Sequence, residues 1–346
     1  MVRNCLRHCP KHFSIYLGEK HCQVRNILSI MLRSNSFTEP WYGGSVAKST
    51  YIFGSTGLSP QRTFIVDMNA LQSSLLAHEL MIQPSSRFVV PDIAFIEMCK
   101  HVDCRRTMRL ALNIFSKHQS QLYAAISVSE ALRNEMNTLR AIQGEELVSL
   151  QFTNVIRNIV IDLMEDDDQL NNRIQADFEF ERNRLLQQEL NAEEARLNSV
   201  KMMQLTQEAL DPRVIMALRK TKLARVNFLA LVQWMAENLF LIQLKKKSGM
   251  SENAARDLLT KRPMYLRYHY LLVRRGLLML KGGGNIPSDA AKELNTHLDM
   301  DYVMLASYFD GLISHDKGVN EAYSDLLTLL STPMLGSAPD SCELVR

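Results

Sequence analysis

Short apolar runs alternate along the chain with segments whose apolar residues recur at helical spacing. Residues 63–66, 87–90 and 122–128 form short runs rich in β-branched, aromatic or small apolar side chains, which is typical of buried strands. Residues 69–78 and 105–117 instead carry apolar side chains at helical spacing. Because strands that alternate with helices usually form a parallel sheet, this part of the chain predicts an α/β fold.

The middle of the chain has a different pattern and reads as helical from about residue 144 to residue 281. Residues 179–207 are rich in Glu, Arg, Gln, Leu and Asn and contain no Gly or Pro, which predicts a long exposed helix. The pair Asp211-Pro212 predicts the start of a further helix, because proline is favoured in the first helical turn. Three consecutive glycines at 282–284 predict the end of this helical block.

Alternation of helices and strands returns in the last part of the chain. We expect a short helix that starts at Ser288 or Asp289 and a second helix that starts at Asp301 and reaches residue 309. Residues 311–313 predict a short strand, and residues 319–330 predict a closing helix.

These patterns divide the chain into five parts. We expect a flexible N-terminal extension at 1–62, the first part of a parallel sheet at 63–143 and a helical insertion at 144–285. The second part of the sheet follows at 286–331, and a flexible tail completes the chain at 332–346. The predicted fold class is therefore α/β, with a three-layer parallel sheet interrupted by an α-helical insertion.

Composition narrows the class of protein. The chain has 346 residues, of which 46% are hydrophobic and 22% charged, and this balance is ordinary for a globular protein. Its six cysteines form no disulfide-like framework, which favours a reducing compartment. No signal-peptide core is visible near the start, and the longest apolar stretch, 226–244, contains too many polar groups for a membrane span. We expect a soluble, cytoplasmic protein without a membrane partner.

Charge is distributed unevenly along the helical block. Residues 165–211 contain 12 acidic and 5 basic side chains, whereas residues 212–281 contain 15 basic and 3 acidic ones. The basic part could track a phosphate backbone, with tyrosines stacking on bases, although a solvated helix face with core tyrosines explains the pattern slightly better. The candidate RNA-binding residues are Lys245, Lys246, Lys247, Arg274 and Arg275, and the tyrosines are Tyr265, Tyr268 and Tyr270.

Carboxylates close to predicted strand ends are the strongest chemical signal. Asp67 follows the first strand, Glu97 lies on the helix after the second, and Asp316 follows the last one. Asp301 would start a helix that packs on the same sheet. Because side chains beyond the carboxyl ends of parallel strands converge in one crevice, we expect these four acids to meet there. Gathered carboxylates suit Mg²⁺ or Mn²⁺, and such a cation supports hydrolysis of phosphodiester bonds.

Each acid also has a simpler interpretation when taken alone. Asp67 and Asp316 would be turn residues, Glu97 would be an exposed helix residue, and Asp301 would be a helix N-cap. It is their joint placement in a frame of alternating strands and helices that favours a shared site.

The segments around these acids resemble those of PIN-domain ribonucleases. The similarity lies in Val66-Asp67-Met68-Asn69, in Val89-Val90-Pro91 leading to Glu97, in residues 301–307 and in residues 312–317. It implies a metal-dependent endoribonuclease that uses Mg or Mn, with Asp67, Glu97, Asp301 and Asp316 as catalytic metal ligands. It also implies that Asn69 and Ser314 orient these ligands by hydrogen bonds.

The chain departs from the PIN pattern at several positions. Asp299 and Asp310 compete with Asp301 for the third acid, and Glu130 matches the second-acid segment almost as well as Glu97 does. An inactive PIN-like module that binds RNA or assembles with proteins is therefore the main alternative. A mainly helical interaction protein, in which the acids never meet, is a second one. The partners we expect are RNA, an inhibitory or assembly protein, and a second copy in a homo-oligomer.

Overall fold

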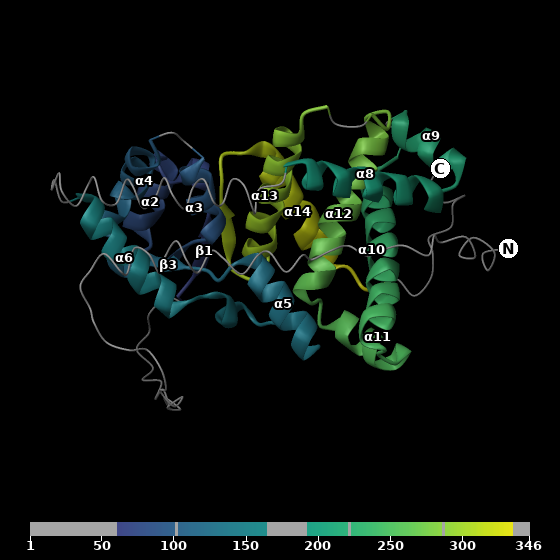
Figure 1. The fold of residues 1–346 in the computed structure, drawn as a ribbon, viewed down its shortest axis with the longest axis horizontal. Coiled ribbons are helices and arrows are strands. Elements are labelled where there is room, and N and C mark those ends of the chain that lie inside the picture. Colours follow the sequence, from purple (N-terminus) through teal and green to yellow (C-terminus); the bar gives the residue numbers. More distant parts are fainter. Residues whose placement is uncertain (1–60, 101–102, 165–191, 221–222, 286–287, 335–346) are drawn as a thin grey trace.

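A computed structural model describes residues 61–100, 103–164, 192–220, 223–285 and 288–334 (Figure 1). Nearly all of the predicted N-terminal extension, most of the predicted tail and much of the predicted long helix at 179–207 lie outside these described residues. The described part of the chain is mostly helical and contains a small, wholly parallel sheet, which agrees with the predicted α/β class.

The sheet has four strands in the order β3-β2-β1-β4. They are β1 (Thr63–Val66), β2 (Arg87–Val90), β3 (Leu122–Ala124) and β4 (Gly311–Ile313). All adjacent pairs are parallel, so the first two strands and the last one are confirmed as predicted. The third strand is shorter than the predicted 122–128, because Ser127 accepts a hydrogen bond from the Glu130 amide and starts the next helix.

Strand β4 brings the C-terminal part of the chain back to the first strand. Ile65 lies opposite Leu312, and Val66 lies opposite Ile313. Phe64 lies opposite Gly311, where an added Cβ atom would approach the Phe64 ring to 3.0 Å. Glycine therefore allows this close approach, which places the residues after β1 and β4 side by side.

Five helices surround the strands of the first part of the chain: α2 (Ser74–Ile82), α3 (Asp92–Cys99), α4 (Cys104–Leu112), α5 (Val128–Thr138) and α6 (Leu150–Met164). Helix α6 falls within the segment predicted as an insertion, yet it packs against β3 and α4. Its buried residues, which include Ile156 and Val160, belong to the same continuous core as the buried strand residues.

A second group of helices lies on the far side of α13 and α14 from the strands (Figure 1). It consists of α8 (Ala192–Ala209), α9 (Pro212–Arg219), α10 (Arg225–Ser248), α11 (Glu252–Thr260) and α12 (Met264–Lys281). Helix α12 packs against α8 and α10, and also against α5, α13 and α14. At Gly276 an added Cβ would lie 3.1 Å from the Met202 side chain, so glycine permits the close contact of α8 with α12.

Helix α13 differs from the predicted arrangement. It runs unbroken from Ala290 to Ala306, with Asp289 as its N-cap, whereas the sequence predicted a second helix starting at Asp301. Residues 290–306 contain no Gly or Pro, so nothing interrupts the helix once it has begun. The prediction that Asp301 caps a helix is therefore wrong, since Asp301 lies in the helix interior. Helix α14 (Lys317–Ser331) starts with Asp316 as its N-cap.

Buried carboxylates connect the helical group to the rest of the molecule. Glu135 on α5 accepts hydrogen bonds from the backbone amides of Met264 (2.9 Å) and Tyr265 (2.7 Å), at the N-terminal end of α12. Asp325 on α14 binds Arg225 and Arg274, on α10 and α12. The helical group is thus fixed to the sheet-bearing part by charged contacts as well as by apolar packing.

The described helices include none that is both long enough and apolar enough to span a membrane. Helix α10, which contains the apolar stretch 226–244, buries Gln233, Glu237 and Gln243 among its core-facing side chains.

Candidate functional site

Asp67 lies directly beyond β1, and its carboxylate is held by the residues that follow β4. It is only 4% exposed. The Ser314 hydroxyl donates to Asp67 Oδ2 at 2.5 Å, and the Asn69 amide lies 3.4 Å from Oδ1. Burial raises the pKa of Asp67, the hydrogen bonds from Ser314 and Asn69 lower it in part, and the charge of Asp316 raises it.

Asn69 and Ser314 connect the ends of β1 and β4 by hydrogen bonds. The Asn69 side-chain oxygen accepts a hydrogen bond from the His315 amide at 3.1 Å. The Ser314 hydroxyl accepts one from the Asp316 amide at 3.0 Å while it donates to Asp67. These contacts place Asp316 next to Asp67 at the carboxyl-terminal edge of the sheet.

Glu97 reaches the same edge from α3. Its Oε2 accepts a hydrogen bond from the Tyr302 hydroxyl at 2.7 Å, and this hydroxyl lies 3.3 Å from the Met68 amide. Burial raises the pKa of Glu97, the bond from Tyr302 lowers it, and the charge of Asp67 raises it further. Tyr302 is a residue that sequence reasoning missed. Its position three residues after Asp299, on the same helix face, is a signal that could have identified it.

Asp299 joins these acids from α13. Its pKa is raised to about 7, mainly by burial and in addition by the neighbouring charges of Asp316, Glu97 and Asp67. We call Asp67, Glu97, Asp299 and Asp316 the acidic cluster. Asp299 was the alternative to Asp301 for the third position, and the electrostatic contacts place Asp299 among the other acids.

Asp301 is turned away from the acidic cluster by helix geometry. Two residues along an α-helix correspond to a rotation of about 200°, so Asp301 lies on nearly the opposite side of α13 from Asp299. Burial raises the pKa of Asp301, as does the charge of Asp92 rather than that of any cluster member. Asp299 rather than the predicted Asp301 therefore lies with the other acids, and the cause is that α13 does not break at residue 301.

Asp310 and Glu130, the other two alternative acids, come from different parts of the fold. Asp310 accepts a hydrogen bond from the Thr63 amide at 2.7 Å, at the amino-terminal end of β1 and thus opposite to Asp67. Glu130 lies in the first turn of α5, which follows the edge strand β3. Of the two candidates for the second acid, Glu97 is the one whose pKa is raised by the charge of Asp67 and whose own charge raises the pKa of Asp299.

Lys100 supplies a positive charge beside the acidic cluster. Its Nζ donates to the Asn295 side chain at 2.9 Å, and its charge acts on both Glu97 and Asp299. Burial lowers the pKa of Lys100, and the two carboxylates partly reverse that shift. Asn295, Asp299 and Tyr302 are spaced four and three residues apart, so one face of α13 meets α3 and the cluster.

The donor chemistry of the acidic cluster suits a hard divalent cation, because every donor is an oxygen atom. Mutual repulsion among its members raises the pKa of Asp299, and such repulsion is relieved when a cation binds. Among the residues that the structure describes, however, no three His, Cys, Asp or Glu side chains already form a metal-binding group. The cluster therefore provides the negative charge for a metal site, but its carboxylates are not positioned to bind one ion together in this arrangement.

The predicted RNA-binding residues are divided between surface and interior. Lys245 pairs with Glu252 at 2.7 Å and Lys246 is exposed, while the side chain of Lys247 lies outside the described residues. Arg274 and Arg275 form ion pairs with Asp325 and Glu293, and their side chains are only 14% and 26% exposed. These two arginines are therefore committed to contacts within the protein.

The tyrosines that were candidates for base stacking belong mostly to the interior. Tyr265 and Tyr270 on α12 are 1% and 0% exposed, and both form hydrogen bonds with residues of α10. Tyr268 is partly buried against the core. The slightly favoured interpretation as core tyrosines is confirmed for Tyr265 and Tyr270, because both are buried at the contact of α10 with α12, and the stacking alternative is not open to them.

Comparison of the chain with protein-family models, with curated proteins and with solved structures finds no match.

Proposed function

We propose that the protein is a PIN-like, metal-dependent endoribonuclease that hydrolyses RNA phosphodiester bonds with Mg²⁺ or Mn²⁺ at the acidic cluster. The observation that supports the proposal is the arrangement of four carboxylates at one edge of a parallel sheet. They come from the ends of β1 and β4 and from α3 and α13, and their charges act on one another. The order of these acids along the chain is the order expected from the resemblance to PIN-domain ribonucleases.

The described contacts give each residue a distinct role in this proposal. A divalent cation, when bound, would lower the pKa of a water molecule and neutralise charge on a phosphoryl oxygen. Ser314 and Asn69 orient Asp67, and Tyr302 orients Glu97. With a pKa of about 7, the Asp299 carboxyl changes between its protonated and ionised forms near neutral pH. Asp299 is thus the member of the cluster best suited to release a proton when a divalent cation binds.

The test is cleavage of a structured RNA in the presence of Mn²⁺ by the wild type and by Asp316→Asn. Asparagine is as good an N-cap as aspartate, so this substitution removes a charge from the cluster and keeps the start of α14. We expect cleavage to fall on the order of 100-fold. Asp211→Asn is the matched control, because Asp211 caps α9 with a hydrogen bond from the Arg213 amide at 2.7 Å.

A wild-type protein that shows no Mn²⁺-dependent cleavage would contradict the proposal. So would equal cleavage by Asp316→Asn and Asp211→Asn. Mn²⁺ binding, measured by the electron paramagnetic resonance signal of the free ion, separates loss of the metal from loss of the chemistry.

An inactive PIN-like module that binds RNA or assembles with proteins is the second candidate. The observation that favours it is that no three acids in the described part of the chain form a ready metal-binding group. It predicts RNA binding that is independent of Mn²⁺ and unaffected by Asp67→Asn, whereas the nuclease proposal predicts that this substitution abolishes Mn²⁺ binding.

A further inference from the structure

A cavity of about 430 Å³ lies between the helical group and α14, and the acidic cluster contributes no residue to it. Its lining comes from α9, α10, α12 and α14, together with Leu223 just before α10. The volume falls within the range of sites that bind small molecules. The lining includes four apolar side chains, which are Leu218, Leu223, Phe228 and Leu278.

One wall of the cavity is a fixed group of charges. Asp325 is almost buried and accepts hydrogen bonds from Arg225 Nε at 3.0 Å and Nη2 at 2.7 Å. Its other oxygen accepts from Arg274 Nε at 2.7 Å. The lining carries three cations, Arg225, Arg274 and Lys281, and two carboxylates, Asp325 and Glu321, so it keeps one net positive charge. The Arg225 side chain remains 63% exposed and so is accessible from solvent.

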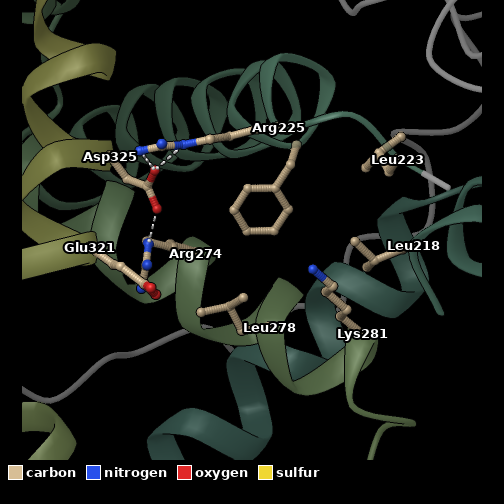
Figure 2. Close-up of a pocket in the computed structure, with 9 residues that line it drawn as sticks. Leu218, Leu223, Arg225, Arg274, Leu278, Lys281, Glu321 and Asp325 are labelled. Atoms are coloured by element: carbon tan, nitrogen blue, oxygen red, sulfur yellow. Dashed lines mark hydrogen bonds and ion pairs between the residues drawn. The ribbon is translucent and has the colours of Figure 1, made fainter. Parts of the chain in front are cut away.

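The opposite wall carries Lys281, the last residue of α12. Figure 2 shows its ammonium group directed into the cavity, between Leu218 and Leu278 and across from the Arg225–Asp325 pair. Within the described residues the Lys281 ammonium takes part in no hydrogen bond or ion pair. The remaining acid of the lining, Glu321, lies 3.7 Å from Lys317 on its own helix.

The cavity therefore combines four apolar side chains with one ammonium group that points inward and a wall of paired guanidinium and carboxylate groups. We propose that it binds a small organic anion, with the apolar body of the ligand against Leu218, Phe228 and Leu278. The anionic group of the ligand lies at Lys281, and the exposed Arg225 guanidinium lies across the cavity from it. An inorganic anion alone would leave the apolar lining unused, and a neutral apolar molecule would leave the ammonium group without a partner.

The proposal is tested with three probes and calorimetric titration of the full chain without metal. Naphthalene-1-sulfonate carries both required features, naphthalene-1-sulfonamide is neutral at pH 7, and inorganic sulfate has no apolar body. We expect the sulfonate to bind and the other two probes to bind at least about tenfold more weakly, since each loses one class of contact.

Lys281→Gln is the decisive variant, because Lys281 is exposed and its loss does not threaten the fold. We expect it to weaken sulfonate binding about tenfold, whereas Lys246→Gln, an exposed lysine on α10, leaves binding unchanged. The proposal is overturned if the sulfonate does not bind at millimolar concentration. It is also overturned if the sulfonamide or sulfate binds as well as the sulfonate, or if the two lysine variants bind it equally.

Discussion

The acidic cluster predicts an unusual pH dependence of stability, and Asp299→Asn isolates it. The pKa of Asp299 is raised from 3.8 to about 7 in the folded protein, so the folded state binds this proton more tightly than the unfolded state does. The stabilisation from the bound proton is complete below pH 3.8 and is lost as pH rises through about 7. Asparagine at this position does not titrate, so the variant loses this dependence.

The expected magnitude follows from the size of the shift. A shift from 3.8 to about 7 corresponds to about 4 kcal/mol over the whole window, of which about 3 kcal/mol falls between pH 5 and pH 8. Asp299 is partly exposed, and solvent screening reduces the contribution of exposed charges. We therefore expect the stability of Asp299→Asn relative to wild type to rise by about 1 to 2 kcal/mol between pH 5 and pH 8.

The assay is urea unfolding of wild type and Asp299→Asn at pH 5, 6, 7 and 8 and constant ionic strength. Asp257→Asn serves as the control, because Asp257 is an exposed residue that pairs with Lys261, the C-cap of its helix α11. A difference between Asp299→Asn and wild type that is the same at every pH would refute the reasoning. Added Mn²⁺ should reduce the difference in unfolding free energy between Asp299→Asn and wild type at pH 8, since a cation bound to the wild type relieves the repulsion among its carboxylates.

Two further substitutions test the contacts around the cluster and the cavity. Tyr302→Phe removes the hydroxyl that donates to Glu97, so the pKa of Glu97 should rise further, as carbon-detected NMR of the carboxyl group will show. Asp325→Asn removes the carboxylate that pairs with Arg225 and Arg274 and leaves the mostly buried Arg274 without its partner. It should lower the free energy of unfolding by about 3 kcal/mol, measured by urea denaturation.

Each of these substitutions has a clear negative outcome. An unchanged pKa of Glu97 in Tyr302→Phe would mean that the hydroxyl does not stabilise the ionised carboxylate. For Asp325→Asn the comparison is Glu252→Gln, which removes an exposed carboxylate paired with Lys245 and Arg256 and should lower the free energy of unfolding much less. Equal losses in the two variants would show that burial of Asp325 is unimportant.

The sequence by itself determined the strand positions and most of the acids. Residues 63–66, 87–90 and 311–313 are short apolar runs bounded by residues that end strands, and such runs have few other stable states. Asp67 and Asp316 could be located because they follow those runs directly. The strands are parallel, so their ends, and the side chains after them, lie at one edge of the sheet.

Only the tertiary structure decided the contribution of α13. The sequence predicted Asp301 and left Asp299 as an alternative, and which of them faces the cluster depends on the rotation of one continuous helix against α3 and the sheet. The contact of Tyr302 is likewise decided by the tertiary structure, since its hydroxyl can donate to Glu97 only when that face of α13 packs against Glu97.

In the basic helical segment, residues 212–281, tertiary structure also decides the role of each charged side chain. Its sequence predicts a positive surface, but Arg274 and Arg275 are turned inward to Asp325 and Glu293, which come from more distant parts of the chain. Local sequence specifies the helix and the charge of each residue. The partner that neutralises a charge is set by packing between separate segments of the chain. This packing distinguishes an interior ion pair from a cation such as Lys281, which has no charged partner within the described ranges.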